Sequence, residues 1–265
     1  MTIAMLDADL IVYQCCAFAE SKPKVTFGED DAAKGSTLES TIATVEEKIK
    51  YQQLMARCDE VVLALSGDTN SNFRKLIHPD YKSARTTEKP EHYAGVLEYL
   101  KRNYKYRSRK ILEGDDILGL AITSGKVDVI VSGDKDILTL PGRILHIVHK
   151  TKVQGPPRIN TVNEADRYWM SQTLTGDSTD GYNGCPGIGP AGVTEILGRD
   201  QSQGLHEMWY KVVQAYERQS RHKRWGNMFN GWSPYSLALA NARCARILRD
   251  GDYSESLEQV VLWNP

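Results

Sequence analysis

Short apolar runs alternate with longer amphipathic segments along the first 150 residues. Five runs have the length and apolar content of strands buried on both faces, at residues 3–6, 61–65, 111–112, 129–131 and 143–148. Apolar residues at helical spacing mark the segments between them, at residues 10–18, 37–58, 93–104 and 116–124. A strand, a crossover helix and a second parallel strand require a right-handed connection. The pattern therefore predicts an α/β fold, Rossmann-like or PIN-like, with a mostly parallel central sheet and flanking helices.

The second half of the chain has a different pattern. The QGPP segment at residues 154–157 interrupts the alternation, and from residue 163 onward the spacing predicts helices only. Asn163 is a suitable cap for the first of them. We expect two units, an α/β core over residues 1–150 and a helical lobe over residues 151–265.

Acidic residues follow the predicted strands at the same end. Asp7 and Asp9 follow the first strand, Asp68 the second, Glu113, Asp115 and Asp116 the third, and Asp134 and Asp136 the fourth; Asp177 and Asp180 come later. Ligands bind outside the carboxyl ends of the strands in open α/β sheets, where strand order reverses. The alternative is that single acids cap turns, or favour the first turn of a helix, as Asp115 and Asp116 would. Repetition over five segments favours convergence at one edge.

A convergent set of carboxylates needs compensating charge. Two carboxylates about 4 Å apart repel by roughly 4 kcal/mol at an effective dielectric near 20. Hard oxygen ligands suit Mg²⁺ or Mn²⁺, and the chain has no His/Cys set of the kind that binds zinc. The sequence therefore predicts a divalent-metal site.

Composition describes an ordinary globular protein. The 265 residues are 41% hydrophobic and 25% charged, with five cysteines and no C-x-x-C spacing. We expect reduced thiols and a cytoplasmic location. If the chain is phage-encoded, this is the cytoplasm of the host. No signal peptide or membrane span is apparent, so we expect no membrane partner.

Basic residues are concentrated in one segment although the net charge is −1. Residues 74–110 hold eleven Lys or Arg against four Asp or Glu, a pattern that a solvated surface loop also shows. Beside a metal site, such a segment suits a polyanionic substrate. Further along, the Gly187-Ile188-Gly189 turn precedes a predicted helix, so its backbone N–H groups form a second predicted anion site.

These motifs together resemble the 5′ nuclease family, which includes flap endonucleases and phage 5′-to-3′ exonucleases. The likeness lies in Asp7, in Asp68 with the downstream YKSAR, in EGDD from Glu113, in SGDKD from Ser132 and in GDSTDGYNGCPGIGP from Gly176. ARILRDGDY and the final LW-x-P are similar to the short phage exonuclease branch.

The resemblance implies roles for individual residues. Two Mg²⁺ ions, replaceable by Mn²⁺, would bind Asp7, Asp68, Glu113, Asp115, Asp116, Asp134, Asp136, Asp177 and Asp180. Asp7, Asp68 and Asp134 would act in catalysis with Lys82 and Arg85, which would contact the scissile phosphate at an arch or clamp over about residues 70–110. DNA would contact Arg74, Lys75, Tyr81 and the Gly187, Ile188 and Gly189 hairpin, where a helix-three-turn-helix motif over about residues 163–198 would hold K⁺.

The implied activity is hydrolysis of DNA from a 5′ end, nick or flap, and of RNA in hybrids, by a monomer. Its setting would be phage-type DNA replication, recombination or host DNA breakdown. A PIN-type ribonuclease shares the acidic pocket, but the helical lobe and the glycine turn speak against it. A DNA-end or junction-binding protein without turnover is the second alternative.

Overall fold

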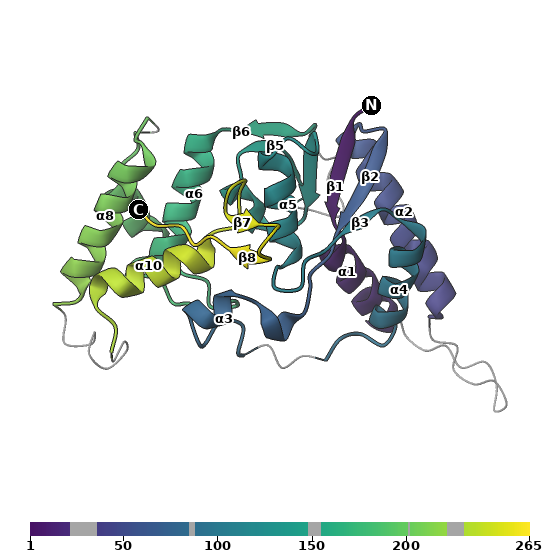
Figure 1. The fold of residues 1–265 in the computed structure, drawn as a ribbon, viewed down its shortest axis with the longest axis horizontal. Helices are drawn as coiled ribbons and strands as arrows, with labels where there is room; N and C mark the ends of the chain where they lie inside the picture. The colour runs from purple at the N-terminus through teal and green to yellow at the C-terminus, as the bar shows by residue number, and fades with distance from the viewer. Residues whose placement is uncertain (22–35, 85–87, 148–154, 201, 222–230) are drawn as a thin grey trace.

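A six-stranded sheet forms the centre of the molecule (Figure 1). The computed structural model describes residues 1–21, 36–84, 88–147, 155–200, 202–221 and 231–265. The strands are β1 (Ile3–Asp7), β2 (Glu60–Ala64), β3 (Tyr106–Arg107), β4 (Val129–Ser132), β5 (Gly142–His146) and β6 (Arg158–Asn160), in the order β3-β2-β1-β4-β5-β6. The first five are parallel and β6 is antiparallel to β5. The predicted fold class is confirmed.

Helices cover both faces of the sheet. Side chains along each strand alternate between the two faces, so they contribute to two separate hydrophobic cores. Leu6 and Val131 face α1 (Ala8–Ser21), α2 (Leu38–Ala56) and α4 (Tyr93–Asn103). Met5 and Ile130 face the opposite core, which includes α5 (Gly114–Thr123). The strand order reverses beside β1, so the carboxyl ends of β1 and β4 frame a crevice.

A helical lobe packs at one end of the sheet. It contains α6 (Val162–Thr175), α7 (Pro190–Leu197), α8 (Leu205–Gln219) and α10 (Pro234–Ala245). Figure 1 labels α6, α8 and α10 of this lobe. Its core includes Trp169, Trp209 and Tyr216. Two shorter elements contact the lobe: α3 (Arg74–Ile77) contacts α10, and η2 (Lys135–Thr139) contacts α6. The short helix η1 (Thr69–Ser71) precedes α3. The described helices include none long and apolar enough to span a bilayer.

Three sequence predictions about local structure are wrong. Residues 111–112 form no strand, because the carbonyls of Lys110 and Leu112 bond to the amides of Asp68 and Gly67 in the loop after β2. Thr161, not Asn163, caps α6; its hydroxyl accepts from the Glu164 amide while the Glu164 carboxylate accepts from the Thr161 amide.

The region after residue 163 is not helical throughout. A hairpin of β7 (Tyr253–Ser254) and β8 (Gln259–Val260) follows the last helix. Ile247 and Leu248, ahead of the hairpin, pack into the core beside α5. The chain therefore returns from the helical lobe to the α/β core, and β6 adds a strand to the sheet beyond residue 150.

Candidate active site

Three carboxylates from different elements lie near the crevice beside β1 and β4, where their charges act on one another. Asp7 ends β1, Asp134 follows β4, and Asp115 lies in the first turn of α5. Burial raises the pKa of Asp7 to about 6, with contributions from Asp9 and Asp134. Burial also raises the pKa of Asp115 well above its ordinary value, assisted by the charges of Asp7, Asp134 and Glu113. The structure thus brings these three together, as the strand-end pattern predicts.

One hydroxyl joins two members of this acid cluster. Ser132 Oγ donates to Asp7 Oδ2 at 2.6 Å and accepts from the Asp134 amide at 2.9 Å. Because β1 and β4 pair in parallel, the last residue of β4 lies beside the end of β1. Ser132 is a positioning residue that the sequence analysis did not single out.

A second group of acids continues from η2 to the loop after α6. Burial raises the pKa of Asp136 to about 7, with further contributions from Asp134 and, more weakly, Asp180. Gln172 Nε2 donates to Asp136 Oδ1 at 2.6 Å. Asp177 accepts a hydrogen bond from Lys135 at 3.2 Å. Burial alone would raise the pKa of Asp177, but the hydrogen bond and the charge of Lys135 outweigh burial and lower that pKa. The predicted second group therefore adjoins the first through Asp134.

Lys82 lies among these acids and compensates part of their charge. Its ammonium donates to Glu113 Oε1 and lies 3.6 Å from Asp180 Oδ2. Tyr81 OH donates to Glu113 Oε2 at 2.8 Å. Burial would raise the pKa of Glu113, but Lys82 and Arg74 outweigh burial and lower that pKa to about 2. The predicted phosphate-contacting lysine therefore projects into the acid site.

A close backbone contact holds the Lys82 turn in place. The Lys82 amide donates to the Asp180 carbonyl at 2.8 Å, and Lys82 has the left-handed φ of 55°. A Cβ at Gly181 would lie 2.2 Å from the Asp80 carbonyl oxygen, and Gly181 has a φ of +80°. Only glycine fits there without displacing the backbone, so the GDSTDG loop and the YKSAR segment form one unit.

The donor chemistry of the site fits hard divalent cations. Its ligating groups are carboxylate oxygens from four elements, and in the described part of the chain no three His, Cys, Asp or Glu side chains already stand close enough to hold an ion. In this structure Lys82 supplies the compensating charge at Glu113 and Asp180. Binding a metal therefore requires small side-chain movements within the acid cluster.

The chain is similar in sequence to known phage exonucleases. No family model matches the chain. It is 28% identical over 292 residues to an exodeoxyribonuclease of Enterobacteria phage T3 and 26% identical over 293 residues to an exonuclease of Escherichia phage T7. Each alignment covers 99% of this chain and 93% of the phage protein. Over almost its whole length the chain is therefore similar to phage exonucleases, which agrees with the resemblance to the 5′ nuclease family.

Solved structures share the fold of this chain. The T5 D15 protein, crystallised with metal ions, has a TM-score of 0.62 at 12% identity, covering 91% of this chain and 88% of the T5 chain. The catalytic core of Rad2, in complex with DNA substrate, has a TM-score of 0.54 at 15% identity, and the match covers 95% of this chain and 80% of the Rad2 chain.

Two residues predicted to belong to the functional site have a structural role instead. Asp116 is fully buried and Arg74 is 2% exposed. Arg74 donates to both Asp116 carboxylate oxygens at 2.8 and 2.6 Å, and Asp116 also accepts from the Leu248 amide. The predictions that Asp116 binds metal and that Arg74 contacts DNA are wrong, because each satisfies the charge of the other inside the protein.

Asp68 and Tyr81 also differ from expectation. The exposed Asp68 carboxylate caps η1, accepting from the Asn70 amide and the Ser71 hydroxyl at 2.9 and 2.7 Å, contacts that lower its pKa. Its predicted metal-binding and catalytic roles stay predictions. Tyr81 is 2% exposed with its hydroxyl on Glu113, so the prediction that it contacts DNA is wrong.

Asp9 occupies a position beside the acid cluster. Its Oδ2 accepts from the Ser66 amide at 2.6 Å, and Ser66 Oγ accepts from the Gly114 amide at 2.9 Å. These bonds tie the start of α1 to the loop after β2 and to the first turn of α5. Asp9 and Ser66 thereby fix the position of Asp115.

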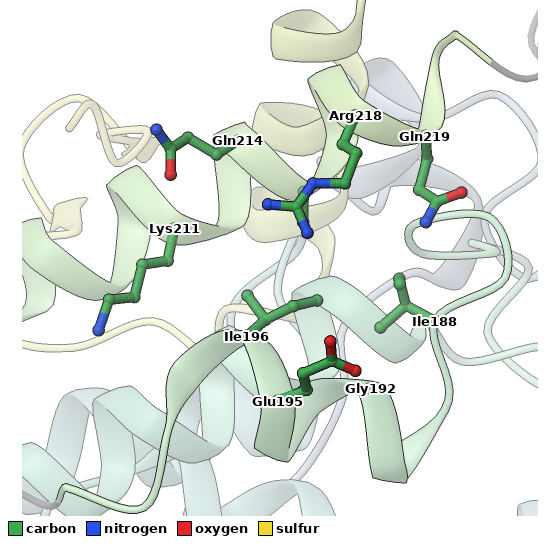
Figure 2. A pocket seen from close by; sticks show the side chains of 9 residues that line it. Ile188, Gly192, Glu195, Ile196, Lys211, Gln214, Arg218 and Gln219 are labelled. Carbon is green, nitrogen blue, oxygen red and sulfur yellow. The ribbon is translucent and has the colours of Figure 1, made fainter.

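The predicted DNA contacts outside the acid cluster differ in exposure where the structure describes them. Lys75 is half-buried, and Arg85 lies outside the described residues. Gly187 and Gly189 are exposed in the turn before α7, whereas Ile188 packs against the helical core. A cavity of about 240 Å³ lies beside this turn. Figure 2 shows Ile188 and Ile196 on one side of it and Lys211 and Arg218 of α8 on the other.

Proposed function

We propose that the chain is a divalent-metal-dependent 5′ nuclease that hydrolyses DNA phosphodiester bonds from the 5′ side. The observation that carries the proposal is the position of Asp7, Asp115 and Asp134 at the ends of neighbouring elements, where their charges interact, with Lys82 paired to Glu113 beside them. The relatives in phages T3 and T7, an exodeoxyribonuclease and an exonuclease, support the same activity. The setting in phage DNA replication, recombination or host DNA breakdown stays a prediction.

The metals proposed are two Mg²⁺ ions, with Mn²⁺ able to replace them. Asp7, Asp115 and Asp134 would hold the first, and Asp136, Asp177 and Asp180 the second. Bound divalent cations polarise a phosphoryl oxygen and lower the pKa of a bound water. The metal ions crystallised with the T5 D15 protein support this assignment.

The protein side chains have two tasks in this proposal. Ser132 and Gln172 hold the carboxylates of Asp7 and Asp136 in orientation, through bonds of 2.6 Å each. Lys82 would leave Glu113 and Asp180 as cations enter, and its ammonium would then neutralise charge gained by the scissile phosphate. Arg85 is proposed to assist Lys82.

Duplex DNA is proposed to bind across the acid site and the turn before α7. The exposed amides of Gly187 and Gly189, in a helix-three-turn-helix arrangement with bound K⁺, would hold the phosphate backbone of one DNA strand. Lys75 would contact another part of the DNA. Arg218 beside the turn adds positive charge for the same purpose, whereas Lys211 is paired with Glu207. The Rad2 core in complex with DNA substrate supports a DNA partner. Action on RNA in hybrids, a monomeric state and a cytoplasmic location stay predictions.

A labelled-substrate assay tests the proposal. A 5′-labelled DNA duplex and a 5′-flap substrate are incubated with Mg²⁺ or with EDTA, and product lengths are measured on a gel. We expect Mg²⁺-dependent release from the 5′ side. Cleavage of single-stranded RNA alone would favour a PIN-type ribonuclease, and DNA binding without any cleavage would favour an end-binding protein.

A further inference from the structure

A cavity of about 460 Å³ opens beside the acid cluster, between α1 and α2. Its lining includes Asp7 at one end, together with Ser132 and Gly133 beyond β4. Its volume lies within the range of about 300–1,000 Å³ of ordinary small-molecule pockets. Because Asp7 belongs both to this pocket and to the acid cluster, any occupant would have one end at the proposed reaction site.

Aromatic rings and apolar side chains form much of the wall. Phe18 of α1 is 53% exposed and Tyr51 of α2 is 46% exposed, and both line the pocket. Leu10 and Ile11 contribute apolar surface deeper in. Exposed rings over an apolar floor suit a flat aromatic ligand, and nucleic-acid bases stack on such rings regardless of their sequence.

Polar groups in the pocket suit the edge of a base. Gln52 is only 4% exposed, lines the pocket and has an Oε1 atom without a hydrogen-bond partner. A buried acceptor without a partner is unfavourable, so a donor supplied by a ligand would be gained there. Lys48 and Gln14 also line the pocket, where the Lys48 ammonium donates to Gln14 Oε1 at 2.5 Å. Side-chain amides are suited to pairing with the donor and acceptor edges of bases.

We propose that this pocket binds a nucleoside 5′-monophosphate unit, with its base between α1 and α2 and its phosphate toward the Mg²⁺ that Asp7 would help to hold, since the phosphate and the carboxylate alone would repel each other. The inference rests on the proposed nuclease function and names a subsite of it. The unit is either the terminal nucleotide of the DNA or the nucleotide released by cleavage, because both present the same chemistry. A terminal nucleotide held there sets the cut next to one base, which favours release of mononucleotides.

Direct binding of dAMP tests the pocket without reference to cleavage. Calorimetry in Mg²⁺ compares the wild type with Tyr51→Ala, Tyr51→Phe and the matched control Lys50→Ala, whose exposed side chain on α2 is outside the pocket lining. We expect Tyr51→Ala to weaken dAMP binding about fivefold or more, from the loss of stacking. Tyr51→Phe and Lys50→Ala should bind as the wild type does.

A second probe and a second variant separate the base from the phosphate. Ribose 5-phosphate has no base, so it should bind the wild type more weakly than dAMP and should be insensitive to Tyr51→Ala. Gln52→Met removes the unpaired acceptor at similar volume, and it should weaken dAMP binding about fivefold without lowering the melting temperature. Equal binding of both probes, or wild-type affinity in Tyr51→Ala, would overturn the proposal.

Product lengths distinguish the two sources of the nucleotide. With 5′-labelled duplex DNA, a smaller mononucleotide fraction in Tyr51→Ala than in Lys50→Ala supports a site for the terminal nucleotide. Unchanged lengths together with weaker dAMP binding support a site for the released product. A wild type that binds dAMP but cleaves no DNA would contradict the nuclease function and not the pocket, so the two failures are distinguishable.

Discussion

Asp115 and Asp116 are neighbours at the start of α5 and have opposite environments. Asp116 shares both oxygens with the buried guanidinium of Arg74. Asp115 faces Asp7, Asp134 and Glu113, and burial among these charges raises its pKa well above the ordinary value. The difference shows that a buried carboxylate paired by the protein is structural, whereas one left among other carboxylates is available to an external cation.

The two cations beside Glu113 differ in the same way. Arg74 is enclosed and also donates to the backbone carbonyls of Cys244 and Arg246, so it is fixed in the interior. The Lys82 side chain is 18% exposed and contacts Glu113 and Asp180, which come from two separate segments. Arg74 is therefore a structural residue, like Asp116. Lys82 is available to an external ligand, like Asp115.

Asp115→Asn should have the largest effect on activity. Loss of one metal-binding oxygen from the acid cluster should reduce turnover by about a thousandfold or more, since metal activation supplies several kcal/mol. The melting temperature in EDTA should rise, because one repelling charge is gone. Glu47→Gln, on the exposed side of α2, serves as the control in both assays. Near-normal turnover in Asp115→Asn would remove Asp115 from the site.

Asp116→Ala should act on stability instead. Removing one partner of a buried ion pair leaves the Arg74 charge uncompensated, and we expect a loss of about 3–5 kcal/mol in the free energy of unfolding. Urea denaturation measures it. The double variant Arg74→Met with Asp116→Leu should recover part of the loss, and an Asp116→Ala protein as stable as the wild type would disprove the structural role.

Lys82→Ala should reduce turnover by roughly a hundredfold while the protein stays folded. The salt dependence of DNA binding, measured in Ca²⁺, should lose only about one unit of slope if Lys82 contacts one phosphate. Lys82→Arg should recover part of the turnover, and Lys101→Ala, on the exposed surface of α4, should change neither quantity. Equal turnover in Lys82→Ala and Lys101→Ala would show that Lys82 is only a surface cation.

The smallest expected effect is the change with pH in the stability of the metal-free protein. Because the pKa of Asp7 is raised to about 6, the folded protein keeps a proton that the unfolded chain has lost above its ordinary pKa near 3.8. Stability in EDTA should therefore fall by about 1–3 kcal/mol as pH rises from 4 to 7. Asp7→Asn should reduce this slope and Mg²⁺ should restore stability at pH 7; a wild-type stability unchanged over that interval would contradict the raised pKa.

The sequence predicts the fold and the crevice because their signals are local. Apolar strands and the acids that follow them are read from a few adjacent residues, and Asp7, Asp115 and Asp134 lie together as expected. The pairing of Arg74 with Asp116 joins residues 42 positions apart, so no local pattern separates Asp116 from Asp115.

Other differences arise from short elements and from competing local bonds. The two-residue strands β3, β7 and β8 are too short to show periodicity. Asp68 resembles a strand-end ligand but caps η1, since Asn70 and Ser71 offer donors nearby. The capping box of Thr161 with Glu164 was present in the sequence as a T-x-x-E signal.

Metal binding tests the central contrast most directly. Isothermal titration of Mn²⁺ into the metal-free protein compares the wild type with Asp115→Asn and Asp116→Asn at pH 7, with folding monitored by circular dichroism. We predict two bound ions in the wild type, loss or at least tenfold weakening of one ion in Asp115→Asn, and wild-type binding in whatever fraction of Asp116→Asn is folded. Wild-type Mn²⁺ binding in a folded Asp115→Asn protein would contradict the account.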